Sequence, residues 1–424
     1  MVMIVAIAEG ADLELIRSGL LSQRCPWLTA LLDDDCWRPL ACGPAPYEPS
    51  NLATAFTGRE RGVHGCYSYW AMRAAGNAMP AILGSGDVRA PMVWQWRALA
   101  DLRTAVINVQ LTHPPQPLNG SMLSYLMAQS LRYSYPPGLV HALKRRGLRY
   151  AHDVSVFYRG EAAASFQARV LQVAAYQLET AIALAREHDV LIVNLTLIDR
   201  VCHFLWRELE TADDPCASRV ADAYGFVDDA LAMLDELAGD DPMLVFSEIG
   251  FGPLERFESI DDALVRAGFQ APESAQNGVD PLAREAPQGS HGVVLSPAAA
   301  SGGLAEEVRA CLLAARSADG RPLVSRVARR EEIYAGPALA LAPDLILYPA
   351  DDRRPPLGDP RWANHVNRHL QTGWHRDLGF IAARRSGRPR SAGQASLAAI
   401  APTIVAMLGR SPPGWCAAPI FAAG

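Results

Sequence analysis

The sequence has neither an excess of basic residues nor a long apolar run. Its 424 residues include 39 lysines and arginines against 45 acidic side chains, so the formal net charge is −6. A protein that neutralises nucleic-acid phosphates needs the opposite balance. No apolar stretch reaches the roughly 18 residues that a membrane-spanning helix requires. We therefore expect a small-molecule substrate, with neither nucleic acid nor a membrane as a partner.

Paired cysteines, a leader and nucleotide-binding loops are also missing. The eight cysteines are scattered without a CxxC pair, which argues against a disulfide framework and a zinc ribbon. The first residues, MVMIVAIAEGADLEL, lack a basic leader and a small-residue cleavage site, so we expect a cytoplasmic protein. Neither a Walker loop nor a GxGxxG fingerprint occurs. Half of the residues are hydrophobic, which is enough for a sizeable core and excludes wholesale disorder.

Short apolar runs alternate with amphipathic segments along the whole chain. The strand-like runs are 2–8, 104–109, 189–197, 242–247, 291–296, 343–349 and 378–383. The helix-like segments are 11–22, 164–188, 221–239 and 304–317. This alternation, with strands that are apolar on both faces, predicts an α/β fold, a three-layer sandwich around a mainly parallel central sheet. Because no linker is long enough to separate two domains, we expect a single domain, 1–424, with loop insertions near 111–160 and 255–375.

Polar side chains stand where several of the predicted strands end. Glu9 follows the first strand and Glu248 follows the run 242–247 directly, and His375 precedes a late strand. Asp199 and His203 follow the run 189–197, and their i, i+4 spacing places both on one face of a helix. Ligands of open parallel sheets bind beyond the carboxyl ends of strands. A carboxylate and an imidazole there can share a cation. Each of these residues alone also fits a structural role. The prediction of a cation site therefore depends on finding all five at strand ends.

One segment resembles a known enzyme family. PYEPSNLATAFTGRERGVHG, 46–65, resembles the nucleophile segment of the type I phosphodiesterase/nucleotide pyrophosphatase family, in the alkaline phosphatase superfamily. In that family a threonine or serine nucleophile stands nine residues before a TG pair and an HG pair follows, which Thr57-Gly58 and His64-Gly65 match. Other segments that resemble the family are AEGAD (8–12), the region 93–120, LIDRVCHFLW (its D-x-x-x-H motif), VFSEIGFGP (its SDHG motif), 342–349, 374–380 and 400–409. The resemblance implies an alkaline phosphatase-like fold for the predicted sandwich.

The departures from the family pattern fall on its chemistry. The family's first aspartate is Glu9 here, its nucleophile position is Glu48, and the Asp-His pair of its SDHG motif is Glu248-Ile249. The resemblance implies one metal site from three retained ligands, which are Asp199, His203 and His375. It implies a second site from Glu9, Glu48 and Glu248, which has lost a histidine to Ile249.

The proposed set of four carboxylates and two imidazoles predicts a dinuclear metal site. Two divalent ions would be needed to hold four carboxylates together against their mutual repulsion. Oxygen-rich ligand sets favour iron or manganese, and zinc is the less favoured alternative. Whether His291, His365 or His369 replaces the ligand lost at Ile249 stays open, as does a solvated helix face for the last two.

Three further residues are candidates for substrate binding. Asn51 would orient a substrate oxygen, or would only cap the following helix. Arg59 follows the TG pair and would meet an anionic substrate, although exposed arginines are common near loops. Arg61, two residues further on, is a candidate for the same contact on the same grounds.

Three functions remain open. The first is a metal-dependent hydrolase that resembles phosphodiesterases and nucleotide pyrophosphatases and acts on a small phosphorylated substrate without a threonine or serine nucleophile. Glu48 would then be catalytic as a base, a bridging ligand or the attacking group itself. The second is a non-hydrolytic, O2-dependent di-iron or di-manganese enzyme, and the third is a non-catalytic member of the family.

Overall fold

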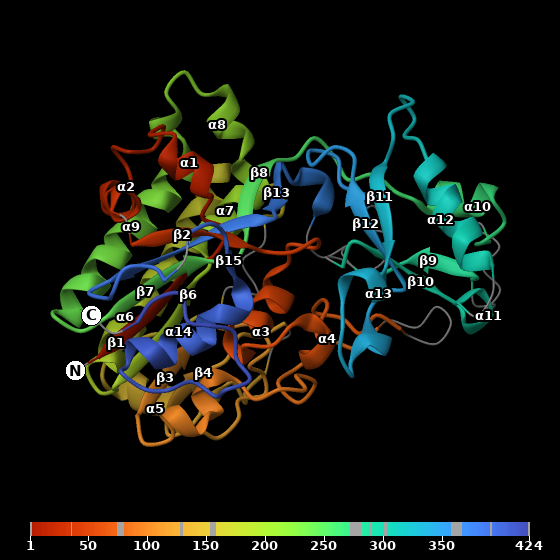
Figure 1. Ribbon diagram of the computed structural model, residues 1–424. Helices are drawn as coiled ribbons and strands as arrows, with labels where there is room; N and C mark the ends of the chain where they lie inside the picture. Colours follow the sequence, from red (N-terminus) through yellow and green to blue (C-terminus); the bar gives the residue numbers. More distant parts are fainter. Residues whose placement is uncertain are drawn as a thin grey trace.

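The protein is built around a nine-stranded sheet (Figure 1). The computed structural model describes residues 2–34, 36–73, 80–127, 130–152, 158–271, 281–287, 290–300, 303–357, 367–390 and 392–422. From edge to edge the strands are β15 (Ala395–Ser396), β2 (Trp37–Ala41), β14 (Leu378–Arg384), β7 (Met243–Ser247), β1 (Met3–Ala8), β6 (Val190–Leu195), β3 (Thr104–Ile107), β4 (Gly120–Leu123) and β5 (Ser134–Tyr135).

The central strands of this sheet run parallel. β1 pairs in parallel with both β6 and β7, and β3 pairs in parallel with β6 and β4, whereas β14 runs antiparallel to β7 and β2. Every residue of β1, β6 and β7 is buried, which explains why these runs are apolar without alternation. The predicted mainly parallel α/β sheet is confirmed.

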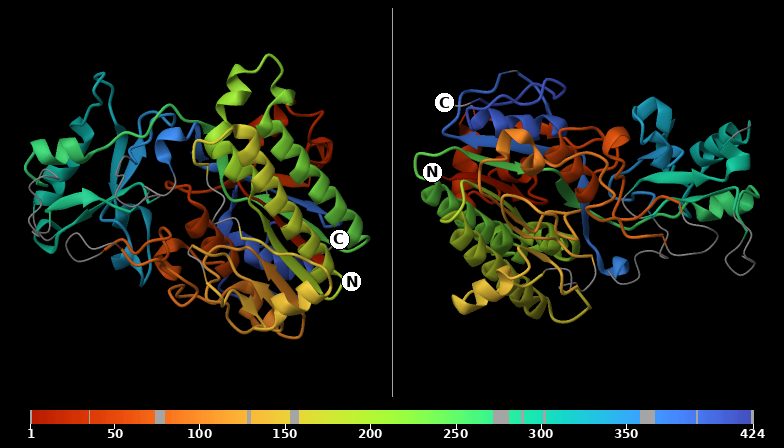
Figure 2. Two further views of the ribbon diagram at one scale, coloured as in Figure 1. Left: turned by 180° about the vertical axis from the view of Figure 1, so that it is seen from behind. Right: turned by 90° about the horizontal axis from the view of Figure 1, so that it is seen from below.

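Helices cover both faces of the sheet, as Figure 2 shows from behind and from below. Along β1, Ile4 and Ala6 join the hydrophobic cluster of one face, and Met3 and Val5 join that of the other. The first face carries α6 (Ala163–Ala185), α7 (Leu197–Leu205), α9 (Arg219–Ala238), α1 (Leu13–Arg17) and α2 (Pro26–Asp33). The second carries α3 (Glu48–Thr57) and α14 (Ile400–Met407). The predicted three-layer sandwich is therefore confirmed.

A second sheet lies to the side of the sandwich, at the right of Figure 1. Its strands, in spatial order, are β11 (Val324–Arg329), β12 (Leu345–Pro349), β10 (Gly292–Leu295) and β9 (Ala283–Glu285). All of its pairs are antiparallel, and its hydrophobic cluster is separate from those of the sandwich. The runs 291–296 and 343–349 are thus strands as predicted, but they belong to this sheet. It lies inside the insertion expected near 255–375, and the single-domain assignment stays a prediction.

Two short strands, β8 (Gly250–Pro253) and β13 (Gly373–Arg376), pair antiparallel where this insertion leaves and rejoins the sandwich. The remaining α-helices are α4 (Arg61–His64), α5 (Leu139–Arg145), α8 (Arg207–Thr211), α10 (Asp261–Arg266), α11 (Pro297–Ala300), α12 (Leu304–Ala314) and α13 (Arg330–Ile333). None of the helices that the structure describes is both long and apolar enough to cross a membrane.

The helix expected over 11–22 is shorter than predicted. α1 begins after Asp12, whose carboxylate accepts a hydrogen bond from the backbone N–H of Leu15 at 2.8 Å. It ends at Arg17, close to Gly19, which has a φ of +74° in the left-handed region. A left-handed glycine terminates a helix because it turns the chain away from the helical path, so the apolar residues 20 and 21 fall outside α1.

Candidate metal centre

Helix α7 brings Asp199 and His203 to the end of the central strands. The backbone N–H of Asp199 donates to the carbonyl of Glu9 at 3.2 Å, which fixes α7 against the end of β1. Gly10 makes this contact possible, because a Cβ atom there would lie 3.0 Å from the Cα of Asp199. Its φ of +77° is also in the left-handed region. Asp199 and His203 both lie on α7, so their predicted placement on one face of a helix is consistent with the structure.

Three buried side chains form a compact ligand set. The Nε2 atom of His375 lies 3.1 Å from Oδ1 of Asp199, and the Nε2 atom of His203 lies 3.3 Å from the same oxygen. One ligand atom from each of the three residues lies within 4.8 Å of the others. The structure thus brings together the three residues for which the resemblance implies one metal site.

Backbone carbonyls orient both imidazoles of this set. The Nδ1 atom of His375 lies 3.0 Å from the carbonyl oxygen of Pro46, and that of His203 lies 3.4 Å from the carbonyl oxygen of Gly373. With the proton on Nδ1, each ring would donate it to the carbonyl and leave Nε2 free to bind a cation. Metal-binding histidines are held in this way by partners behind the ligand atoms.

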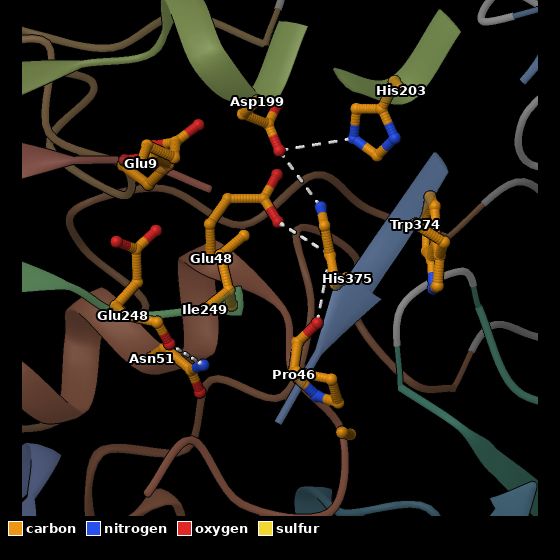
Figure 3. Close-up of polar contacts among 12 residues, drawn as sticks. Glu9, Pro46, Glu48, Asn51, Asp199, His203, Glu248, Ile249, Trp374 and His375 are labelled. Atoms are coloured by element: carbon orange, nitrogen blue, oxygen red, sulfur yellow. Dashed lines mark hydrogen bonds and ion pairs between the residues drawn. The ribbon is translucent and has the colours of Figure 1, made fainter. Parts of the chain in front are cut away.

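Three glutamates surround the set, as Figure 3 shows. Glu9 and Glu248 are fully buried and Glu48 is almost so. Among the described residues, Oε1 of Glu9, Oε2 of Glu48 and both oxygens of Glu248 have no hydrogen-bond partner. Their oxygens do not belong to the compact set within 4.8 Å, although Oε2 of Glu48 lies 3.8 Å from Nδ1 of His375. Buried carboxylate oxygens without partners are costly unless a cation satisfies them.

The pKa values of the four carboxyl groups also indicate that the cluster needs cations to hold it in the ionised form. Burial, and then the neighbouring Asp199, raise the pKa of Glu9 to about 8. Burial followed by the other carboxylates raises the pKa of Glu48 and of Glu248 well above its usual range. Burial opposes ionisation of Asp199 too, but His203, His375 and Arg200 hold its pKa well below its usual range. Bound divalent cations would stabilise all four as carboxylates, so the donor set fits two metal ions.

Two amides that the sequence prediction missed hold Glu9. The side chains of Gln110 and Asn194 both donate to Oε2 of Glu9, at 2.6 Å from Gln110. Asn194 also donates to Oε1 of Gln110 at 2.9 Å. The signal was present, since Asn194 is the polar residue in the otherwise apolar strand β6. With Oε2 occupied, Glu9 has Oε1 left for a ligand.

Arg200 is a third residue that the prediction missed. Its guanidinium lies 2.9 Å from Oδ2 of Asp199, and it donates to the Tyr125 hydroxyl at 2.6 Å. Oδ1 of Asp199 faces the histidines, so the two oxygens of this carboxylate have different partners. The position of Arg200, directly after Asp199, is the only signal in the sequence.

Asn51 lies inside α3 and is not the cap of a following helix. Its amide nitrogen donates to the carbonyl oxygen of Glu248 at 2.8 Å, and its amide oxygen accepts from Arg61 at 2.6 Å. It is fully buried within α3, which begins at Glu48. Asn51 therefore links Arg61 to the backbone beside Glu248 and does not cap the helix. Its contact with a substrate stays a prediction.

Arg59 lies away from the cluster. Its guanidinium is 3.5 Å from the centroid of the Trp415 ring, at the opposite end of α3 from Glu48. A helix of ten residues separates the two positions by roughly 15 Å. Nothing in the structure brings Arg59 to the carboxylates, and its role with an anionic substrate stays a prediction.

The candidates for the lost ligand at Ile249 differ in placement. Ile249 itself is fully buried. His369 is exposed on the surface, and His365 lies outside the described residues. His291 is buried just before β10, and its two ring nitrogens have no hydrogen-bond partner among the described residues. Of the two histidines that the structure describes, His291 fits a role at a buried site.

The sequence matches a known protein family over most of its length. The model of the family described as type I phosphodiesterase/nucleotide pyrophosphatase matches residues 4–375, which includes every predicted metal ligand. No curated protein matches the sequence.

Solved structures of the alkaline phosphatase superfamily share the fold. Phosphonoacetate hydrolase from Sinorhizobium meliloti 1021, solved with phosphonoformate, is 16% identical with a TM-score of 0.61, covering 90% of this chain and 89% of that chain. Murine ectonucleotide pyrophosphatase/phosphodiesterase 5 is 11% identical with a TM-score of 0.57, covering 98% and 97%. The alkaline phosphatase PafA is 13% identical with a TM-score of 0.58, covering 99% and 98%.

Proposed function

Because this chain belongs to the type I phosphodiesterase/nucleotide pyrophosphatase family, we propose that it is a metal-dependent hydrolase of a small phosphoester, and that it works without a hydroxyl nucleophile. Asp199, His203 and His375 would hold one divalent cation. Glu9, Glu48 and Glu248 would hold a second, with iron or manganese favoured over zinc by the oxygen-rich set. A small molecule is the expected substrate.

One observation carries the proposal. Glu9, Glu48 and Glu248 are buried beside the three-residue set, and each has at least one carboxylate oxygen without a partner among the described residues. Loss of function would be expected to replace such ligands with small or apolar residues, but three carboxylates stand here. Among the positions that correspond to the family's ligands and nucleophile, only Ile249 is apolar. Several uncompensated acids would destabilise the fold, so their presence supports a bound cation pair.

The residues of this chain would have separate roles in the proposed hydrolysis. Two divalent cations, when bound, would polarise a phosphoryl oxygen and make the attacking water more acidic. Glu48 accepts the proton of that water at Oε2 as water attacks phosphorus. The bond from phosphorus to the alcohol oxygen breaks, and the alcohol leaves with a proton from solvent. Arg200 holds Asp199, and Gln110 with Asn194 holds Glu9, so these carboxylates stay in place.

Hydrolysis by the metal-loaded chain tests the proposal. The full chain would be loaded separately with manganese, iron(II), zinc and magnesium, and assayed against phosphomonoesters, phosphodiesters and sulfate esters. We expect cleavage of at least one phosphoester that disappears on chelation, and anomalous scattering that places two ions at the six ligands. If no ester in the panel is cleaved by any metal-loaded form, the hydrolase proposal fails.

A second function is favoured by one specific observation, the carboxylate at the position of the family's nucleophile. Glu48 heads α3 where a hydroxyl is expected, and four carboxylates with two imidazoles is also the inventory of helical di-iron and di-manganese proteins. The alternative is a non-hydrolytic, O2-dependent di-iron or di-manganese enzyme. Protein purified without oxygen would then contain iron or manganese and would consume O2 with a small organic substrate. Zinc alone in the native protein would exclude it.

A further inference from the structure

A cavity of about 830 Å³ opens beside the metal centre. Its walls come from the segments 82–87 and 111–117, and Tyr69 and Tyr125 also line it. Ligand sites for small molecules commonly have volumes of ~300 to 1,000 Å³. None of the six predicted metal ligands lines it, so the cavity adjoins the centre and is distinct from it.

Two contacts join the cavity to the metal centre. The hydroxyl of Tyr125 accepts a hydrogen bond from Arg200, whose guanidinium also bonds Asp199. The ring of Tyr69 packs edge-on against Tyr47, with centroids 5.5 Å apart, and Tyr47 directly precedes Glu48. The cavity is therefore separated from the metal centre by single layers of side chains.

The lining is mainly apolar and carries little charge. Its apolar residues are Tyr69, Ile82, Leu83, Leu111, Pro114, Pro115, Pro117, Tyr125 and Met127. No lysine or arginine is among the described residues that line it. Asp87 accepts a hydrogen bond from the backbone N–H of Gly84 at 2.8 Å, and burial lowers the pKa of His113. An additional phosphate would find no cation here, whereas an uncharged apolar group would be desolvated.

Two aromatic rings of the lining stack on each other, and one of them carries a buried hydroxyl without a partner among the described residues. Tyr69 and Tyr125 are stacked, with centroids 5.9 Å apart and planes at 16°. Tyr69 is 3% exposed, and its hydroxyl has no hydrogen-bond partner among the described residues. A buried hydroxyl without a protein partner is uncommon in folded proteins.

We propose that this cavity binds the alcohol part of the phosphoester, and that this alcohol is uncharged and apolar, with an aromatic or similar planar group. The Tyr69 hydroxyl donates a hydrogen bond to the ester oxygen at the junction of the cavity and the centre. This inference rests on the proposed hydrolase function and specifies its substrate class. A nucleoside polyphosphate fits the cavity poorly, because no lysine or arginine is among the described residues that line it.

Two matched esters test the inference on the metal-loaded full chain. 2-Phenylethyl phosphate and ethyl phosphate both lose a primary alcohol of similar acidity, so their rates differ mainly through binding of the phenyl group. We expect kcat/KM to be roughly 50-fold higher for the phenylethyl ester, as burial of a phenyl ring implies. Binding of 2-naphthol, measured by calorimetry on the same protein, gives a readout that needs no turnover.

Three variants locate the effect. Leu83→Arg places a charge in the cavity wall, and we expect it to reduce the ratio of the two kcat/KM values to near one and to abolish 2-naphthol binding. Leu131→Arg is the matched control, because Leu131 is 98% exposed and does not line the cavity, and the ratio should stay as in the wild type. Tyr69→Phe keeps the stacked ring, so both esters should slow by about tenfold with their ratio unchanged.

The outcomes separate this inference from the hydrolase proposal. Equal kcat/KM for the two esters, or wild-type protein that does not bind 2-naphthol, would overturn the inference and leave hydrolysis standing. If no ester is cleaved while 2-naphthol binds to the wild type but not to Leu83→Arg, the cavity keeps its ligand class and the hydrolase function fails. Unchanged rates in Tyr69→Phe would remove the hydroxyl from the inference.

Discussion

The side-chain amide of Asn51 donates to the backbone carbonyl of Glu248 at 2.8 Å. The other end of the same amide accepts from the buried Arg61, which also bonds the carbonyl oxygens of Cys42 and Ala45. The position of Glu248 therefore depends on a chain of hydrogen bonds from Arg61, and a change at Asn51 acts on a carboxylate that it does not touch through its side chain.

Asn51→Ala should destabilise the protein and weaken the metal centre. It removes one partner from the guanidinium of Arg61 and one from the Glu248 carbonyl, so we expect a loss of about 2 kcal/mol in the free energy of unfolding. Urea unfolding measures it. Asn119→Ala is the control, because the Asn119 amide also bonds a backbone carbonyl but at the exposed surface, and its loss should be well below 1 kcal/mol. Equal losses would contradict the linking role.

Gly10→Ala should separate α7 from the end of β1. Its φ of +77° disfavours any side chain, and the added Cβ would meet the backbone of Asp199 at 3.0 Å. Gly19→Ala is a matched control because Gly19 has a similar φ of +74° with open space around it. We expect the control to lose about 1 kcal/mol and to keep its metal affinity. Gly10→Ala should lose more stability and at least tenfold in affinity, measured by metal titration.

Glu48→Gln should abolish most of the activity while the fold persists. The substitution keeps the size of the side chain and removes its capacity to accept a proton or to bind a cation as an anion. We expect kcat to fall by roughly 100- to 10,000-fold. Glu236→Gln, at an exposed position on α9, is the same chemical change outside the site and should have no effect. Substantial activity in Glu48→Gln would refute Glu48 as the base.

Chelation should destabilise the protein. With cations removed, the buried glutamates either repel one another or take up protons, whereas bound metal stabilises the folded state by mass action. At metal concentrations of ~100 times the dissociation constant we expect a gain of about 2.7 kcal/mol over the metal-free protein. Thermal unfolding with and without chelator measures it. In His375→Ala, which loses one ligand of the compact set, the gain should be clearly smaller, and an unaltered gain would contradict the assignment.

His64 should make stability depend on pH. Burial lowers its pKa from 6.5 to about 3, and its ring bonds the hydroxyl of Thr54 and the backbone N–H of Cys66. Below pH 6.5 the unfolded chain gains a proton that the folded chain refuses. Stability should therefore fall by up to ~1.4 kcal/mol per pH unit between pH 6.5 and 3 and should not change through His64 above pH 6.5.

The measurement for His64 is the urea midpoint at pH 7 and pH 5. His64→Gln removes the titrating group, so its midpoint should fall less between these values than that of the wild type. His141→Gln, at an exposed position on α5, should follow the wild type. A fall in His64→Gln as steep as in the wild type would show that other groups control the acid lability.

Much of the sandwich could be predicted from the sequence because its central strands are buried on both faces. β1, β6 and β7 consist almost entirely of apolar residues, and short runs of this kind are typical of parallel strands covered by helices on both sides. The assignment of 291–296 and 343–349 to a second sheet could not be predicted. Those runs look the same in sequence, and only long-range pairing, such as that of β10 with β9, separates the two sheets.

The ligands of the compact set could be predicted because Asp199 and His203 share a helix face and His375 matched a family segment. The side chains that hold these ligands in place could not be predicted from the sequence. Gln110 reaches Glu9 from a segment that is far away along the chain, and its position follows only from the neighbouring placement of β3 and β6. Arg200 looked like an ordinary polar residue of a helix. The partners of a site depend on strand order, which residue spacing does not encode.

The pairing of β8 with β13 also affects how the centre is made during synthesis. His375 lies on β13 opposite Phe251 on β8, and the whole of the second sheet is encoded between them. A nascent chain therefore carries Glu9, Asp199 and Glu248 for the time it takes a ribosome to translate that insertion, with one imidazole still unmade. The compact set of Asp199, His203 and His375 is therefore complete only after the insertion has been translated, and a product truncated within the insertion would carry the acidic residues without His375.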